Sequence, residues 1–148
     1  MNLSKNIKIS NAMTEASTLA ATTGLSIDMS GFEGCLFVLH GTSLMAGTTY
    51  ALRAKGAASS AGPWVFYEPS VSSTLVTTGT FNYRIMALDM YKPLKRYIRA
   101  SIPTATTDVK TARLVTAIQY GARYPGSTNL YDSTTLAGVT LAVGATSS

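Results

Sequence analysis

Apolar and polar residues alternate along most of this chain. Residues 48–55, 83–91 and 95–102 place apolar side chains at alternate positions over most of their length, which is the pattern of a β-strand with one buried face. Residues 35–40 (CLFVLH) form a short continuous apolar run, which is typical of a strand buried on both faces. Weaker strand patterns occupy residues 5–10, 64–68, 72–78, 111–120 and 136–143. No segment has the period of a convincing amphipathic helix.

The alternation also predicts which side chains share a face. In the two clearest strands the shared faces are Met86, Leu88 and Met90, and Ile98, Ala100 and Ile102. Tyr50, Leu52 and Ala54 share a face at 48–55, and Ile7 and Ile9 share a face of the first strand.

Turn-forming residues separate the strands every 8–15 residues. Residues 56–63 (GAASSAGP) are a flexible turn, Pro93 interrupts the pattern between two strands, and the Ala- and Thr-rich residues 12–25 are expected to be a loop or a single turn. Many short strands at this spacing are typical of a β-sandwich or a barrel. We therefore predict an all-β fold, a single antiparallel, jelly-roll-like β-sandwich over residues 1–148, with about eight strands and extended arms at 1–25 and 126–148.

Composition supports this fold class and excludes disorder. The chain has 148 residues, enough for one domain, and 46% of them are hydrophobic. Only 13% are charged, about half of the roughly 25% usual in soluble domains, while 21 Thr and 16 Ser supply much of the polar character. The β-branched threonines favour strands, and intrinsic disorder requires low hydrophobicity with high charge, which this chain lacks.

Charge and cysteine content limit the partners. The 12 Lys and Arg residues exceed the 7 Asp and Glu residues by 5, which favours acidic partners. A single cysteine excludes an intrachain disulfide and a cysteine-based zinc site. No apolar run approaches about 18 residues and residues 1–10 lack the apolar core of a signal peptide, so we expect no membrane partner and synthesis in a cytoplasm.

The sequence offers little support for an enzyme. His40 is the only histidine, and we interpret it as a partly buried residue at a strand end that hydrogen-bonds to the backbone. Cys35 lies five residues earlier, an odd separation that places it on the opposite strand face, so a Cys–His pair is excluded there. No two of the seven acids lie within four positions of each other, so a glycosidase-like pair across strands finds no support in the spacing. We expect no catalytic residue, no cofactor and no metal.

One segment of the chain is unusually rich in basic and aromatic residues. Residues 91–99 (YKPLKRYIR) hold four of the twelve basic residues, and the candidate interface residues are Tyr91, Lys92, Lys95, Arg96, Tyr97 and Arg99. A hairpin kept soluble by its charges is the simplest interpretation. A docking surface toward an acidic protein follows closely, because Tyr and Arg are enriched at interface hot spots. A nucleic-acid groove ranks third, since such a binder would spread more cations beyond one hairpin.

The C-terminal segment and the aromatic residues raise two further hypotheses. Residues 126–148 contain a single charge, Asp132, and resemble an extended arm. Pairing of the strand at 136–143 with a neighbouring subunit or shell would satisfy its backbone, so we add Leu136, Val139, Leu141 and Val143 as candidates and expect a homo-oligomer, with a trimer favoured over a dimer. The eight tyrosines and Trp64 are expected in the core or at its rim, whereas a carbohydrate-binding face needs exposed rings in a line.

Three segments carry a resemblance to a known family. They are residues 28–34 (DMSGFEG), residues 89–99 (DMYKPLKRYIR), and residues 117–123 (AIQYGAR) followed by Pro125. In their order and spacing they resemble small virion proteins of tailed bacteriophages that are encoded beside the major capsid protein and act as capsid decoration, or cement, proteins. The resemblance runs from about Ile7 to the C-terminus. It implies a jelly-roll or related β-sandwich fold.

The resemblance also implies a non-enzymatic role on the outside of a capsid shell, with the major capsid protein of the same virus and other copies of the chain as partners. A lattice repeats each contact many times, so a weak interface becomes strong in sum. Two other classes stay open: another virion part, such as a neck, tail or receptor-binding β-domain, and a free carbohydrate-binding module. Nucleic acid is not an expected partner.

Overall fold

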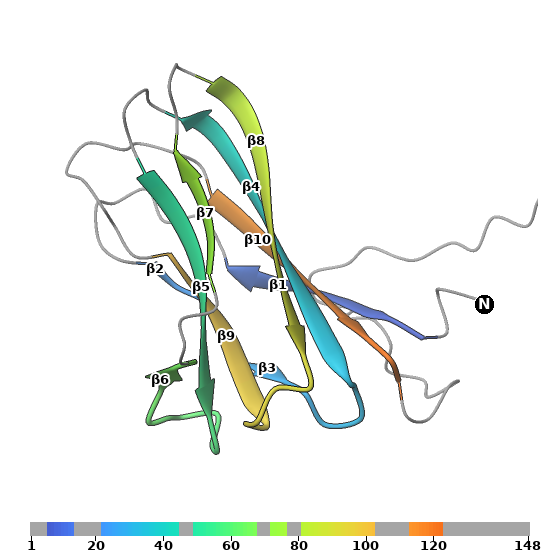
Figure 1. The fold of residues 1–148 in the computed structure, drawn as a ribbon. Helices are drawn as coiled ribbons and strands as arrows, with labels where there is room; N and C mark the ends of the chain where they lie inside the picture. The colour runs from blue at the N-terminus through green and yellow to red at the C-terminus, as the bar shows by residue number, and fades with distance from the viewer. Residues whose placement is uncertain are drawn as a thin grey trace, which may run out of the picture.

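The computed structural model describes residues 6–13, 22–44, 49–67, 72–76, 81–102 and 113–122, and these residues contain ten β-strands and no helix. The strands are β1 (Lys8–Met13), β2 (Thr22–Thr23), β3 (Ile27–Asp28), β4 (Gly34–Leu44), β5 (Thr49–Ala57), β6 (Val65–Phe66), β7 (Ser72–Val76), β8 (Phe81–Tyr91), β9 (Tyr97–Ile102) and β10 (Arg113–Tyr120). They form two sheets that pack face to face (Figure 1). No helix among the described residues is long and apolar enough to cross a bilayer.

The strand order is that of a jelly roll. One sheet has the order β1-β10-β4-β8, and the other has the order β2-β9-β5-β6, with β3 also on β9 and β7 also on β5. β2 and β3 lie end to end along β9, and β6 and β7 lie end to end along β5, so each sheet has four strand positions. Every pairing is antiparallel, and the chain passes between the sheets at most connections but stays in one sheet from β5 through β6 to β7, which agrees with the jelly-roll-like sandwich predicted from the sequence.

The core lies between the sheets and is built from the predicted faces. Met86, Leu88 and Met90 of β8 are buried, as are Ile98, Ala100 and Ile102 of β9. Phe37, Leu52 and Val115 are fully buried beside them, and each buried side chain of this size stabilises the fold by about 1.5–3 kcal/mol. The outward neighbour Ile85 is 67% exposed, so the alternation of β8 is confirmed.

The first strand differs from the prediction in extent, and its core side is the side opposite Ile7 and Ile9. β1 begins at Lys8 and continues through Ala12 and Met13, and Thr22–Thr23 form β2, where the sequence predicted a loop. Ser10 and Ala12 are buried whereas Ile9 is only partly buried, so the shared face of Ile7 and Ile9 is not the core face.

The backbone at Gly24 passes very close to Ala12 and Ala100, which explains why all three residues are small. The amide of Leu25 donates to the carbonyl of Ala12 (2.7 Å), and the amide of Gly24 donates to that of Ala100 on the opposite sheet (2.8 Å). A Cβ on Gly24 would lie 2.6 Å from the Ala12 oxygen. The segment before β3 therefore ties the two sheets together where only small side chains fit.

Strand β4 also departs from its prediction. Cys35, Phe37 and Leu39 are buried, but Leu36 and Val38 are only partly covered, so the strand is buried on one face and not on both. His40 is exposed in the middle of this strand, which runs on to Leu44, so its interpretation as a partly buried strand end is wrong. The outer face of the four-stranded sheet has no layer to cover it among the described residues. The predicted strand at 136–143, with Leu136, Val139, Leu141 and Val143, lies outside the described residues.

Candidate functional site

The connection between β8 and β9 passes from one sheet to the other. β8 pairs with β4 in the four-stranded sheet, whereas β9 pairs with β5, β2 and β3 in the six-stranded sheet, so the predicted hairpin at 92–99 is wrong (Figure 1). Pro93 cannot donate to a ladder, and Lys92 adopts a left-handed backbone conformation (φ 48°) that turns the chain out of β8. We call residues 92–96 the arch.

The arch lies against a tight turn between β3 and β4. The amide of Phe32 donates to the carbonyl of Met29 (3.1 Å), and Gly31 has φ 86°, which fits the third position of a type II turn. The amide of Ser30 donates to Oδ1 of Asp28 (2.9 Å), which fixes the entry into the turn. We call residues 29–33 the β3–β4 turn.

Backbone hydrogen bonds hold the arch at both ends and near its middle. The amide of Met29 donates to the carbonyl of Arg96 (2.8 Å), and the amide of Lys92 donates to the carbonyl of Glu33 (2.7 Å). The amide of Lys95 donates to the hydroxyl of Tyr67 (3.2 Å), whose ring packs against the core. Burial raises the pKa of Tyr67, so this hydroxyl stays protonated at neutral pH. The arch is therefore ordered before any partner binds.

Arg96 forms a two-pronged ion pair with Asp28. Its Nε donates to Oδ1 (3.0 Å) and its Nη2 donates to Oδ2 (2.8 Å). The hydrogen bond from this guanidinium is the main reason why the pKa of Asp28 is lowered, and the same contact raises the pKa of Arg96. Arg96 thus positions the arch, and its charge is largely neutralised within the chain.

Gln119 contacts the start of the β3–β4 turn from the opposite sheet, and its part in the site was not predicted from the sequence. It belongs to β10 of the opposite sheet, is 1% exposed, and donates from Nε2 to the carbonyl of Asp28 (2.7 Å). The same nitrogen lies 3.7 Å from Sδ of Met29. A signal was present in the sequence, because Gln119 is the polar member of the inward series with Val115 and Ala117.

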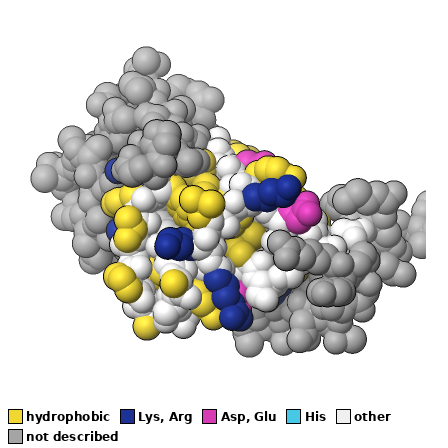
Figure 2. All heavy atoms as spheres, turned by 60° about the horizontal axis from the view of Figure 1, so that its bottom comes forward, with side chains coloured by type: hydrophobic (Ala, Val, Ile, Leu, Met, Phe, Trp, Pro, Cys, Tyr) yellow, Lys and Arg dark blue, Asp and Glu magenta, His cyan; other side chains and the backbone are white. Residues whose placement is uncertain are grey.

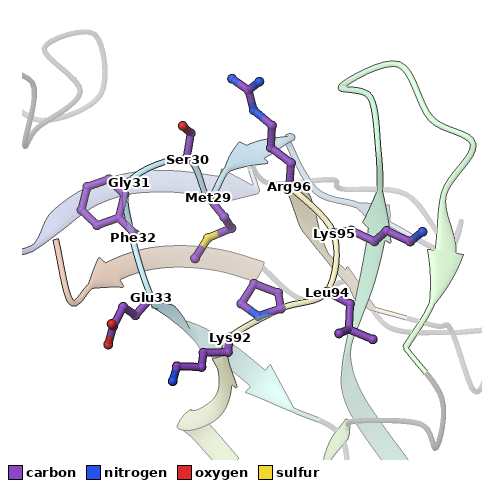
Figure 3. Close-up of a pocket in the computed structure, with 10 residues that line it drawn as sticks. Met29, Ser30, Gly31, Phe32, Glu33, Lys92, Leu94, Lys95 and Arg96 are labelled. Carbon is purple, nitrogen blue, oxygen red and sulfur yellow. The ribbon is translucent and has the colours of Figure 1, made fainter. Parts of the chain in front are cut away.

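An open cavity of about 440 Å³ lies between the arch and the β3–β4 turn. Its lining is Met29, Ser30, Gly31, Phe32, Glu33, Lys92, Pro93, Leu94, Lys95 and Arg96 (Figure 3). The side chains of Lys92, Lys95 and Arg96 point in different directions, and Leu94 is 90% exposed beside the cavity. On this end of the molecule basic side chains are interspersed with apolar ones, and acidic side chains occur at few points (Figure 2).

The structure divides the predicted basic cluster between two surfaces. Lys92, Lys95 and Arg96 stay together on the arch, and two of them lie over the flanking rings, Lys92 over Tyr91 (5.1 Å to the centroid) and Arg96 over Tyr97 (5.1 Å). Arg99 lies instead on the outer face of the six-stranded sheet, because it is the outward neighbour of the buried Ile98 and Ala100.

The side chains that could take part in catalysis do not form a catalytic arrangement with each other among the described residues. Cys35 is buried and His40 is exposed, so they lie on opposite faces as the odd spacing predicted. Burial raises the pKa of the Cys35 thiol to about 12. The hydroxyl of Tyr120 donates to Oδ1 of Asp89 (2.6 Å), and burial, followed by this contact, raises its pKa. In the described ranges no three His, Cys, Asp or Glu side chains gather closely enough to hold a metal ion.

Comparison with known proteins gives no family assignment. No family model matches the chain, and no curated protein matches it. Among solved structures the chain is similar to the PBSX exported protein XepA, with 18% identity and a TM-score of 0.48 over 96% of this chain and 45% of that one. The chain thus spans less than half the length of XepA.

Proposed function

We propose that this protein is a non-enzymatic virion structural protein that binds the outside of a phage capsid shell and stabilises it. The observation that carries the proposal is the convergence of the three segments that resemble capsid decoration proteins. The β3–β4 turn, the arch and the end of β10 meet at one end of the sandwich, where Gln119 bonds to the Asp28 carbonyl and the amide of Glu33 donates to the Tyr120 carbonyl (3.1 Å).

The arch has the anatomy of a protein-docking element. Leu94 offers an apolar side chain that is 90% exposed, and the cavity next to it can receive a side chain of the partner. Because three hydrogen bonds already order this backbone, binding costs little additional conformational entropy. An apolar anchor surrounded by polar groups is the usual arrangement of an interface hot spot.

The charges of the arch favour an acidic partner. Lys92 and Lys95 are exposed. Within the described part of the chain neither lysine forms an ion pair, because the ion pair found there joins Asp28 and Arg96. A partner with carboxylates around an apolar pocket would complement both Leu94 and these two lysines. On the resemblance, that partner is the major capsid protein, and repetition over the lattice adds up many modest contacts.

The two remaining classes have less support. Trp64 and Phe66 lie two residues apart near the edge of the six-stranded sheet, as a carbohydrate-binding row would require, but each ring carries a cation over it. Sugar stacking needs an open ring face, so these contacts count against the carbohydrate-binding module. A neck, tail or receptor-binding component would attach at another place on the particle or bind a host receptor, and the three segments that carry the resemblance favour the shell instead.

Adding the purified protein back to shells that lack it tests the proposal. We expect cosedimentation with the shells, and Leu94→Asp should weaken binding by at least about tenfold because it places a charge where the apolar anchor docks. Leu25→Asp is the matched control, since Leu25 is a half-exposed leucine outside the arch and the β3–β4 turn. Equal binding of all three proteins would overturn the role of the arch, and absence of binding by the unmodified protein would overturn the capsid proposal itself.

A further inference from the structure

The outer face of the six-stranded sheet carries three cations laid over two aromatic rings. Arg53 and Lys55 of β5 lie over the ring of Phe66, with the Arg53 Cζ at 4.2 Å and the Lys55 Nζ at 4.4 Å from its centroid. Arg99 of β9 lies over the ring of Trp64, with its Cζ at 4.2 Å. Each cation is the outward neighbour of buried core residues. We call these five residues the cation–ring face.

The register places like charges directly opposite one another. Lys55 and Arg99 are partners across β5 and β9, and Arg53 is two positions further along β5. Like charges directly opposite each other destabilise a sheet. No described acidic side chain pairs with any of the three, because the ion pair in the described ranges is that of Asp28 and Arg96. Among the described residues no acidic side chain neutralises these charges, whereas a bound anion would.

The contact with the Trp64 ring leaves Arg99 partly buried and oriented so that it can bind an anion. Its Nε is buried and has no hydrogen-bond partner, and burial lowers its pKa, although an arginine remains charged at any physiological pH. A partly desolvated cation interacts more strongly with an incoming anion than one in bulk water. A guanidinium laid on a ring keeps N–H groups at its edge, which match the two oxygens of a carboxylate.

We propose that the cation–ring face binds the carboxylates of an extended acidic segment of a partner protein. Alternate residues of an extended chain lie about 7 Å apart on one side, which is also the spacing of Arg53 and Lys55 along β5. An acidic segment that runs along β5 therefore presents its carboxylates in step with the two cations. This surface is separate from the arch, and the inference does not rest on the proposed function.

Other occupants fit this face less well. Single-stranded nucleic acids gain affinity by stacking bases on open rings, and here cations occupy a face of both rings. A second copy of this chain is a poor partner, because the chain has a net charge of +5 and would bring like charges together.

The single tryptophan provides a direct measurement, because Trp64 lies under Arg99. The probe is a peptide of alternating Glu and Thr, titrated against the full-length protein while Trp64 fluorescence is recorded. We expect a saturable change, and a peptide of equal composition with its Glu residues in one block should bind more weakly. Lys55→Gln and Arg99→Gln should each weaken binding by about tenfold. Lys8→Gln removes the same charge outside the arch and the cation–ring face and should change affinity less than about twofold.

Three outcomes would overturn the inference. Equal weakening by Lys55→Gln, Arg99→Gln and Lys8→Gln would mean that the peptide responds only to the net charge of the protein. Tighter binding of a single-stranded oligonucleotide, or of a sulfated oligosaccharide of equal charge, would assign the face to one of those ligands. Arg99→Lys keeps the charge and tests the two-pronged contact in a conservative background, so undiminished binding by this variant would remove the role of the guanidinium. Because no shells are used, these results are independent of the capsid proposal.

Discussion

Asp28 accepts two hydrogen bonds from Arg96, which lies 68 residues later in the chain. This pair joins the end of β3 to the end of the arch and fixes the β3–β4 turn against it. It also changes the meaning of the basic cluster, because Arg96 serves the internal geometry while Lys92, Leu94 and Lys95 remain free to meet a partner. A charge reversal at Arg96 would place two acids together and disrupt the site before it tested any contact.

The Asp28–Arg96 pair should make the free energy of unfolding depend on pH in the acid range. The pKa of Asp28 is lower in the folded protein than its unfolded value of about 3.9, so its contribution is present above that value and is lost as pH falls through the folded pKa. We expect Asp28→Asn to lower stability slightly at neutral pH and to reduce the loss of stability on acidification. Urea unfolding at several pH values from about 6 to 2 gives the free energy of unfolding of each protein. If this free energy falls equally steeply with pH in Asp28→Asn and in the unmodified protein, the prediction is contradicted.

Gln119 should stabilise both the fold and the site. In Gln119→Leu the partly buried carbonyl of Asp28 loses its donor, which should cost about 1–3 kcal/mol and loosen the β3–β4 turn. Chemical unfolding gives the free energy, and faster amide hydrogen exchange at Met29 and Lys95 would report the loosening. Thr116→Leu, at an outward position of the same strand, is the control and should stay within about 0.5 kcal/mol. Unchanged exchange in a destabilised Gln119→Leu protein would separate Gln119 from the site.

Cys35 should be unreactive in the folded protein. Its thiol is fully buried and its pKa is raised to about 12, so almost no thiolate forms at pH 8. We expect negligible labelling by a thiol reagent until denaturant is added, followed by complete labelling. Cys35→Ser and His40→Ala should both bind shells normally when folded. Rapid labelling of the native protein, or loss of binding by either folded variant, would reopen a chemical role.

The protein should assemble as a homo-oligomer, with a trimer favoured over a dimer. The segment proposed to pair between copies, residues 136–143, lies outside the described residues, so this prediction still rests on its apolar pattern. Light scattering should give about three times the 15.6 kDa of one chain. A monomer at every concentration, with one symmetric copy per capsid subunit on particles, would contradict it.

The sequence predicts most of the fold because local alternation is enough to define a strand and its buried face. The inward series of β8 and β9 are examples, and the turn signals between strands favoured the jelly roll. The alternation does not say which sheet a strand joins. The connection at 92–96 was therefore predicted as a hairpin, although it crosses between the sheets and leaves Arg99 on a different surface from Lys92.

The features that were not predicted from the sequence also have physical causes. The inward face of β1 depends on a register shift between Asn11 and Met13, where the amide of Met13 donates to the Asn11 side chain (3.1 Å), and on the close passage of Gly24. Neither feature is visible in a pattern of apolar residues. The partners of Arg96 and Gln119 are both distant in sequence, so their roles in the site required the three-dimensional structure.

Electron cryomicroscopy of shells with and without the added protein tests the central claim most directly. We expect additional density on the outside of the shell at regular lattice positions, with the end that carries Leu94 and the arch against the capsid protein. Leu94→Asp should leave those positions empty, and Leu25→Asp should fill them. Density confined to the neck or tail, or molecules on the shell with the arch pointing into solvent, would contradict the proposed function.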